Sequence, residues 1–256
     1  MRRVLLIQKA ADKKDAKPEE IKKSFRTMGV TACQQMQGKK ASDVEFLVSS
    51  KVGSSELLGI FENSFHLTNY ENSHKKQPSE EEQEKDKEEE ALDKDDRTKR
   101  INKKVDNFVV STENTSVVED QDYKFQQASA RATEFARNLA NARGSVATPE
   151  WMEHQIMDLL KKHEGKVGEV RVLQADELQK LGMNLFYNVG KGAISQPRCV
   201  IVHYEGNPEK KGEVEIALVG KGVTFDTGGL NLKPSGYMED MYGDKGGSCA
   251  VLGALQ

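Results

Sequence analysis

Two aspartates and two lysines lie among glycines near the end of the sequence, at Lys221, Asp226, Lys233 and Asp244. Two carboxylates that come together repel each other unless a cation lies between them, so this grouping favours one or two divalent metal ions. A pair of ions roughly 3.5–4 Å apart can bind a bridging water, lower its pKa and stabilise an oxyanion. The residue types therefore indicate metal-dependent hydrolysis.

The two lysines suit different roles in such a site. A lysine beside metal ions can lose its proton and bind a metal ion, or it can keep its proton and act as an electrophile. Both roles are possible because burial and nearby cations lower the pKa of a lysine. Lys221 directly follows an apolar run typical of a strand, so it is the better candidate for a metal ligand. Lys233 precedes a proline in a more extended loop and is the better candidate for polarising a carbonyl.

Glycines surround these four residues and allow the backbone to approach a metal ion or a substrate closely. The same composition also suits a phosphate-binding loop or ordinary turns. However, Gly220-Lys221-Gly222 has neither the Walker spacing nor a Ser or Thr after its lysine, and the run lacks the sixth-position glycine of a dinucleotide fingerprint. From the residues alone, a metal site, a phosphate loop and structural turns remain open, with the metal site favoured.

Alternating apolar segments precede this site and predict the elements that position it. Strands are expected at 4–7, 44–48, 105–110, 169–173, 199–204 and 214–219, and helices from residue 18 and at 54–70, 120–141, 148–160 and 176–181. Such alternation indicates an α/β fold with a mixed, mainly parallel sheet covered by helices. Sites in such sheets form beyond the carboxyl ends of the strands, where Lys221 and Asp226 fall.

A length of 256 residues is sufficient for two domains. Residues 77–104 are dominated by charged side chains with almost nothing apolar, so they cannot bury enough surface to offset their ordering entropy. We therefore expect a small N-terminal α/β domain at 1–120, with a disordered acidic insertion at about 77–104. A second α/β domain is expected at 121–256.

Composition narrows the functional class. The net charge of −3 gives no electrostatic case for nucleic-acid binding. The three cysteines lie far apart and form neither a zinc spacing nor a disulfide framework, so a reducing compartment is expected. The N-terminal apolar run is too short for a signal peptide, and no run approaches the roughly eighteen apolar residues of a membrane span. We expect a soluble cytoplasmic protein.

The run from Val219 to Pro234, followed by Met238, Met241 and Asp244-Lys245-Gly246-Gly247, closely resembles the leucyl (cytosol) aminopeptidase family of dinuclear metallopeptidases. The similarity extends from about Phe125 to Gln256, whereas the first 120 residues match only loosely. Upstream segments that fit the family pattern are Ala136-Arg137-Asn138-Leu139, Thr148-Pro149, Leu181-Gly182-Met183, Val189-Gly190 and the run from Pro197 to Tyr204.

The resemblance implies a small N-terminal α/β domain, a larger catalytic α/β domain and, in the family, a homohexamer. Lys221, Asp226 and Asp244 fall on metal ligands, and Lys233 falls on a catalytic lysine that contacts the substrate. Met241 falls on a residue that lines the pocket for the substrate's first side chain. The implied cofactors are two divalent ions of manganese, zinc or magnesium. The implied reaction removes the N-terminal residue of a peptide with a metal-bridging water as nucleophile.

The resemblance also implies a second acidic motif, Asn-Thr-Asp-Ala-Glu-Gly-Arg, tens of residues beyond Asp244, and this sequence does not contain it. In the family, that motif supplies an Asp and a Glu ligand and an arginine that holds a bicarbonate. We therefore expect a C-terminally truncated family member that contains only the N-terminal part of the catalytic domain, with weakened metal binding.

Three hypotheses for the function follow from these patterns. The first is a metal-dependent aminopeptidase that acts on peptides. The second is a catalytically inactive family member that serves as an oligomer subunit or an interaction protein. The third is a nucleotide- or phosphate-binding protein that uses the glycine loop.

Overall fold

The computed structural model describes residues 16–48, 54–72, 104–112 and 114–256. Contacts cluster into two compact units, Met1–Glu134 and Phe135–Gln256, with the division inside the long helix α5 (Gln121–Asn141). The domain boundary predicted between residues 120 and 121 corresponds to the start of this helix and stays a prediction. The predicted strand at 4–7 and the acidic insertion, apart from Lys104, lie outside the described residues.

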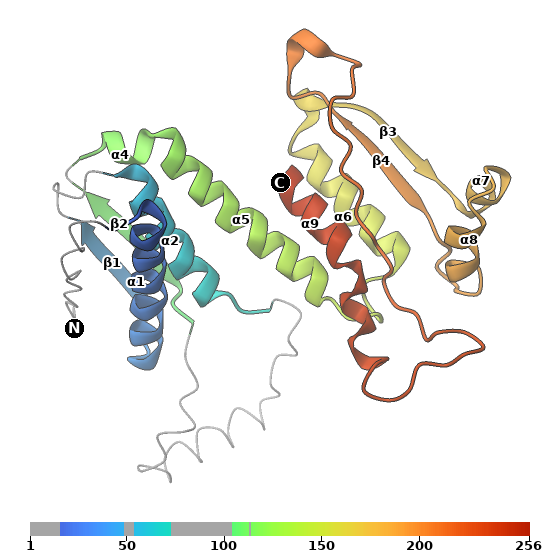
Figure 1. Cartoon of the computed structure of the whole chain (residues 1–256), viewed down its shortest axis with the longest axis horizontal. Coiled ribbons are helices and arrows are strands. Elements are labelled where there is room, and N and C mark those ends of the chain that lie inside the picture. The colour runs from blue at the N-terminus through green and yellow to red at the C-terminus, as the bar shows by residue number, and fades with distance from the viewer. Residues whose placement is uncertain (1–15, 49–53, 73–103, 113) are drawn as a thin grey trace. The chain divides into compact units, whose positions relative to one another are not determined.

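The first unit combines helices with one pair of strands (Figure 1). Strands β1 (Asp43–Val48) and β2 (Asn107–Thr112) pair in parallel, with Asp43 opposite Asn107. The strand predicted at 44–48 is confirmed, and the one predicted at 105–110 begins two residues later. The helices of this unit are α1 (Pro18–Gly38), α2 (Ser55–Asn69), α4 (Ser116–Glu119) and the first part of α5.

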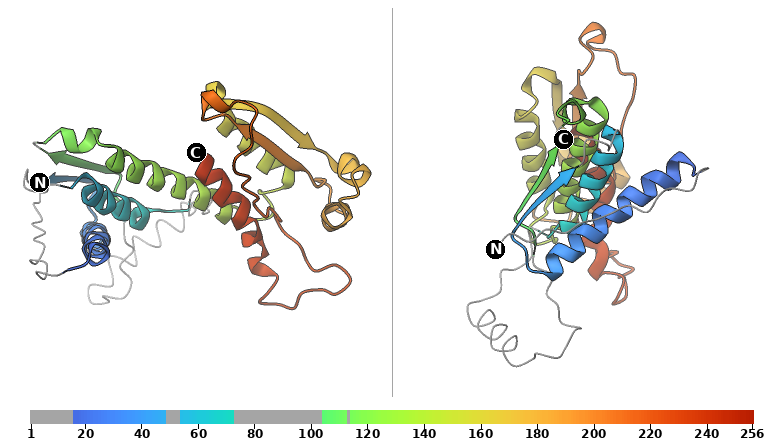
Figure 2. Two further views of the ribbon diagram at one scale, coloured as in Figure 1. Left: turned by 45° about the horizontal axis from the view of Figure 1, so that its top comes forward. Right: turned by 90° about the vertical axis from the view of Figure 1, so that its left-hand side faces the viewer.

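One face of the β1–β2 pair packs against α1 and α2 (Figure 2). Alternate residues of β1 face the helices because side chains of a strand point to opposite sides in turn, so Phe46 contacts this core while Leu47 is exposed. Phe65 of α2 stacks on Phe108 of β2 with ring centroids 4.1 Å apart. This arrangement gives the first unit its own hydrophobic core.

A buried polar cluster joins α2 to α5 within the first unit. The Tyr123 hydroxyl donates a hydrogen bond to Glu62, Gln127 Nε2 donates to Glu62 Oε1 at 3.3 Å, and His66 Nε2 lies 3.6 Å from the same oxygen. Burial opposes the charge of Glu62, but the hydrogen bonds from His66, Tyr123 and Gln127 outweigh it and lower the pKa of the carboxyl. Glu62 is therefore a satisfied buried carboxylate.

The second unit also contains both helices and strands, so the α/β class is confirmed. The α6 helix starts as predicted, because the Thr148 side chain accepts a hydrogen bond from the Trp151 amide at 3.1 Å and Pro149 holds the first position. The helices that follow α5 are α6 (Pro149–Lys161), α7 (Ala175–Lys180), α8 (Asn184–Gly190) and α9 (Gly246–Leu255), with short 3₁₀ helices η1 (Glu164–Lys166), η2 (Pro208–Lys210) and η3 (Glu239–Lys245).

The core of the second unit lies between the end of α5 and helices α6 and α9, which run side by side in Figure 1. An ion pair between Arg198 and Glu153 ties the segment that enters β4 (Cys199–Tyr204) to α6. The buried residues of this core are Leu139, Met152, Leu159, Cys249 and Leu252.

The strands of the second unit differ from the predicted arrangement. β3 (Val167–Leu173) and β4 pair antiparallel, with Leu173 opposite Cys199, whereas the sequence predicts a mainly parallel sheet. The strand predicted at 214–219 is absent: Val214, Ile216 and Leu218 are exposed, and none of the strands in the described part of the chain pairs with them. A strand is defined by its hydrogen-bonded neighbour, so an alternation of apolar residues without such a neighbour is not sufficient to form one.

Of the helices that the structure describes, none has the length and hydropathy that crossing a membrane requires.

Candidate metal centre

The loop after Thr224 brings Lys233 onto Asp226. Asp226 Oδ1 accepts hydrogen bonds from the Gly228 amide at 2.9 Å and from Lys233 Nζ at 2.5 Å. Lys233 Nζ also donates to the Asp226 carbonyl at 3.1 Å. Gly228 has φ +94°, and a Cβ at this position would lie 2.4 Å from the Asn231 carbonyl oxygen, so only glycine permits this turn.

The second pair joins Lys221 to Asp244. Lys221 Nζ lies 3.0 Å from Asp244 Oδ2, with the lysine side chain 64% exposed and the aspartate 29% exposed. The Lys221 carbonyl accepts a hydrogen bond from the Ser248 amide in the first turn of α9 at 2.8 Å. A Cβ on Gly220 would lie 2.5 Å from Ser248 Cα, so the segment before Lys221 packs directly on the start of α9. Helix α9, rather than a sheet partner, holds Lys221 in place.

We refer to these two ion pairs, Lys221–Asp244 and Lys233–Asp226, together as the charge cluster. The hydrogen bond from Lys233 holds the pKa of Asp226 below its ordinary value, although partial burial acts to raise it. The hydrogen bond from the Gly228 amide and the positive charges of Lys233 and Lys221 also lower this pKa. The charge of Lys221 therefore acts on both Asp226 and Asp244. The structure brings together Lys233 with Asp226 and Lys221 with Asp244, and the shared site predicted for these four residues stays a prediction.

The donor set fits part of a divalent-ion site. Carboxylate oxygens suit hard cations. In this structure each carboxylate forms an ion pair with a lysine ammonium, so each already binds a cationic group. Across the described ranges, however, no group of three His, Cys, Asp or Glu residues could hold a metal ion. Two aspartates and one lysine nitrogen supply fewer donors than two complete coordination shells need.

Met241 lies half-buried in η3, where its amide donates a hydrogen bond to the Met238 carbonyl at 3.1 Å. It does not line the depression that adjoins the Asp226 loop. That depression has a volume of about 350 Å³ and is lined by Arg143, Gly144, Ser145, Phe225, Glu239 and Tyr242. The role predicted for Met241 in substrate binding stays a prediction.

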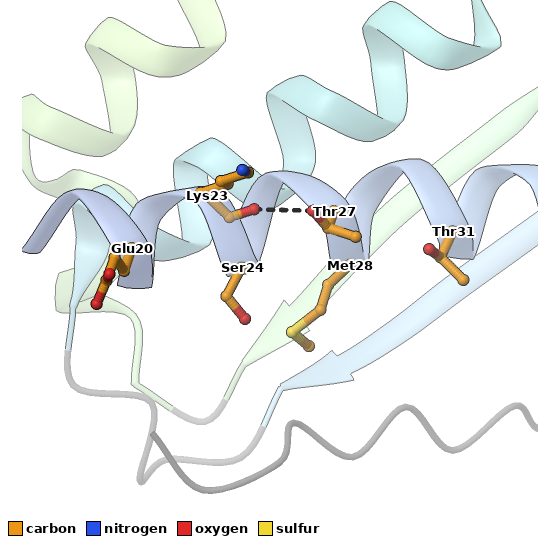
Figure 3. A pocket seen from close by; sticks show the side chains of 6 residues that line it. All are labelled: Glu20, Lys23, Ser24, Thr27, Met28 and Thr31. Atoms are coloured by element: carbon orange, nitrogen blue, oxygen red, sulfur yellow. Dashed lines mark hydrogen bonds between the residues drawn. The ribbon is translucent and has the colours of Figure 1, made fainter. Parts of the chain in front are cut away.

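A second depression, of about 440 Å³, follows one face of α1 (Figure 3). Its only acidic lining residue is Glu20, whose carboxylate accepts a hydrogen bond from the Lys17 amide at 3.2 Å. The Thr27 hydroxyl donates to the Lys23 carbonyl within the helix at 3.0 Å. This surface offers a single carboxylate, so it lacks the donor set of a divalent-ion site.

Lys245 was not singled out by its sequence pattern, yet it is fully buried beside the cluster. Its Nζ donates to the backbone carbonyls of Ala140, Ala142 and Tyr242 at 3.1, 2.7 and 2.5 Å. Burial lowers the pKa of this lysine, and the nearby Arg143 acts in the same direction. A lysine in a charged, glycine-rich run normally faces solvent, so no signal in the sequence predicted the burial of Lys245.

Comparison with known sequences finds a family model that matches the segment containing the charge cluster. The model of the cytosol aminopeptidase family, catalytic domain, matches residues 134–256. A probable cytosol aminopeptidase of Persephonella marina is 40% identical over 137 residues, which are 54% of this chain and 26% of that protein. A probable cytosol aminopeptidase of Aquifex aeolicus is 43% identical over 128 residues, 50% of this chain and 25% of that protein. The chain thus spans about a quarter of the length of these relatives.

Solved structures give a wider match that includes the first unit. A bottromycin maturation enzyme, BotP, in complex with Mn has a TM-score of 0.65 and 25% sequence identity, and the match covers 91% of this chain and 43% of that one. A second structure of BotP has a TM-score of 0.62 with 23% identity over the same shares of the two chains, which supports the fold alone. Residues 134–256, which contain all four residues of the charge cluster, are therefore similar to the catalytic domain of the cytosol aminopeptidase family.

Proposed function

We propose that this chain contributes to a metal-dependent aminopeptidase of the leucyl type, which removes N-terminal residues from peptides. The observation that carries the proposal is the cluster of two Lys–Asp pairs, Lys221–Asp244 and Lys233–Asp226, inside the segment that matches the family. Both carboxylates are partly exposed and each is paired with a lysine ammonium. A divalent ion can therefore reach them and take the place of an ammonium.

In this proposal Lys221, Asp226 and Asp244 hold the metal. A divalent ion at these residues supplies Lewis acidity to a peptide carbonyl and to a water. Lys233 Nζ donates two hydrogen bonds to Asp226, one to its carbonyl and one to Oδ1, and an ammonium has three N–H groups. The remaining N–H is available to donate a hydrogen bond to the oxyanion that develops as the peptide carbonyl becomes tetrahedral.

The finer parts of the proposal have separate support. Manganese is the first ion to test, because the BotP structure with the TM-score of 0.65 is a complex with Mn; zinc and magnesium are the alternatives. We further propose peptide substrates, a cytoplasmic location and a homo-oligomer, which is a hexamer in the family. The relatives' description as cytosol aminopeptidases supports the location and the substrate class.

The test uses the full chain with Mn²⁺ and a leucine-initiated peptide. We expect release of the N-terminal residue from the free peptide and none from its N-acetylated form, because the amine is part of what the site recognises. Asp226→Asn and Asp244→Asn should each abolish release, while Asp158→Asn, on the exposed face of α6, should leave it unchanged. Near-normal turnover in either site variant would refute the assignment.

The second candidate is a non-catalytic family member that acts as an oligomer subunit or an interaction protein. It is favoured by the finding that no group of three His, Cys, Asp or Glu residues suited to a metal lies within the described residues. Under this hypothesis the chain copurifies with a complete cytosol aminopeptidase and has no peptidase activity of its own. Failure to enter any oligomer, together with metal-dependent turnover, would eliminate it.

A further inference from the structure

A charged side chain that is fully buried needs a structural reason, because the loss of hydration must be offset by hydrogen bonds. The exposed fraction of Lys245 is 0%, and its ammonium has three N–H groups. The three carbonyls that accept from it, those of Ala140, Ala142 and Tyr242, equal that number. Lys245 is therefore completely satisfied by backbone oxygens.

Two of those carbonyls lie at the carboxyl end of α5, which ends at Asn141. The last carbonyls of a helix have no partner within the helix and carry its partial negative charge. A lysine from a segment about one hundred residues later in the chain thus caps α5. The third carbonyl belongs to η3 itself, so the same ammonium also fixes the turn that carries Asp244.

The same corner of the second unit holds both halves of the Lys221–Asp244 pair. The Lys245 carbonyl accepts a hydrogen bond from the Ser248 hydroxyl at 2.8 Å, and the Ser248 amide donates to the Lys221 carbonyl at 2.8 Å. The Arg143 guanidinium lies 3.9 Å from the centre of the Tyr242 ring and adds a second contact between the end of α5 and η3. A displacement of Lys245 would therefore move Asp244 and Lys221 relative to each other.

We propose that Lys245 is a positioning residue, which anchors η3 and the start of α9 to the carboxyl end of α5 and thereby holds Asp244 opposite Lys221. Its relevance to metal binding rests on the proposed function, whereas the anchoring does not. Groups that orient metal ligands typically change metal affinity about 10- to 100-fold when removed. Lys245 would act in this way through the backbone rather than through a ligand side chain.

The test compares Lys245→Met with Leu159→Ala in the full chain. Methionine keeps an unbranched apolar stem and removes the ammonium, while Leu159→Ala destabilises the same core without touching the anchor. The first readout is hydrogen exchange at the Ser248 amide, whose partner is the Lys221 carbonyl and not a group of its own helix. The amide of Ile156 in α6 serves as the internal reference. The second readout is Mn²⁺ affinity by calorimetry.

We expect Lys245→Met to accelerate exchange at Ser248 by about tenfold or more relative to Ile156 and to weaken Mn²⁺ binding by about 10- to 100-fold. Leu159→Ala should accelerate both amides together and leave the Mn²⁺ affinity of the folded protein unchanged. If Lys245→Met does not fold, Lys245→Gln, which keeps N–H donors on a shorter side chain, is compared in its place.

Unchanged relative exchange at Ser248 would overturn the anchor. Equal loss of Mn²⁺ affinity in Lys245→Met and Leu159→Ala would also overturn it, because a general destabilisation would then explain both. If the wild-type chain takes up no Mn²⁺, the proposed function fails, and the exchange measurement alone decides whether Lys245 anchors the corner.

Discussion

The polar cluster around Glu62 in the first unit and the charge cluster around Asp226 and Asp244 in the second satisfy their carboxylates in opposite ways. Glu62 is buried, lies 3.6 Å from His66 Nε2 of its own helix, and accepts from the neutral side chains of Tyr123 and Gln127 on a neighbouring helix. Asp226 lies in an irregular loop and Asp244 in the 3₁₀ helix η3, and both are partly exposed and face lysines. The first arrangement holds helices together, and the second leaves its carboxylates within reach of solvent.

The difference separates structural from functional polar groups. A buried hydrogen-bonded carboxylate contributes to stability because losing one partner leaves the other unsatisfied. Exposed Lys–Asp pairs contribute roughly 0–1 kcal/mol, so stability gives little reason for two of them on glycine-rich loops. Substitution of Glu62 should therefore change the free energy of unfolding, whereas substitution in the charge cluster should change the metal affinity.

Asp226→Asn should have the largest effect, and on metal binding alone. We expect Mn²⁺ affinity to fall by more than about 100-fold, beyond what loss of an orienting group produces, because a direct charged ligand is lost. The free energy of unfolding should change by less than about 1 kcal/mol, because the pair with Lys233 is partly exposed. Calorimetric titration and denaturant unfolding measure the two quantities. Wild-type affinity in this variant would remove Asp226 from the proposed site.

Glu62→Gln is the matched change in the first unit. The neutral amide cannot replace the charge-assisted hydrogen bonds to Tyr123 and Gln127, so we expect a loss of about 1–3 kcal/mol in the free energy of unfolding of this unit. Mn²⁺ affinity should not change. A loss of metal affinity here would show that the two clusters are not independent.

The pH dependence of stability should follow Glu62. Because the pKa of this carboxyl is lowered in the folded state, its contribution is complete above the unfolded pKa, about 4.3, and is lost as the pH falls through the folded pKa. The difference in unfolding free energy between wild type and Glu62→Gln should therefore shrink as the pH falls below about 4. Urea unfolding at a series of pH values measures it, and a difference independent of pH would contradict the assignment.

Lys221→Ala should have the smallest effect on stability, below about 1 kcal/mol, because this side chain is mostly exposed in its pair with Asp244. The change should shrink further at high salt, where exposed charges are screened. Thermal unfolding at low and high ionic strength gives both values. A large loss that is insensitive to salt would mean that Lys221 supports the core.

Local sequence signals predicted the helices well. Thr148 followed by Pro149 marked the start of α6, and apolar residues at three- and four-residue steps marked α5 over nearly its whole length. These signals succeed because caps and helical periodicity depend on neighbours close in the chain. The structure pairs Lys221 with Asp244 and Lys233 with Asp226, while the single site predicted for these four residues awaits the experiments above.

Long-range partners could not be read from the sequence. The run at 214–219 has the alternation of a strand, but pairing depends on a second segment, and the described residues provide none. The burial of Lys245 depends on carbonyls about one hundred residues earlier in the chain. Its sequence neighbours Asp244 and Gly246 give no sign of that contact.

Zinc anomalous diffraction from crystals of the full chain soaked in Zn²⁺ tests the central claim most directly. The account predicts a peak about 2.0–2.2 Å from carboxylate oxygens of Asp226 and Asp244, with Lys221 Nζ separated from Asp244 as a further ligand of the ion. A peak elsewhere on the chain, with both Lys–Asp pairs intact, would contradict it.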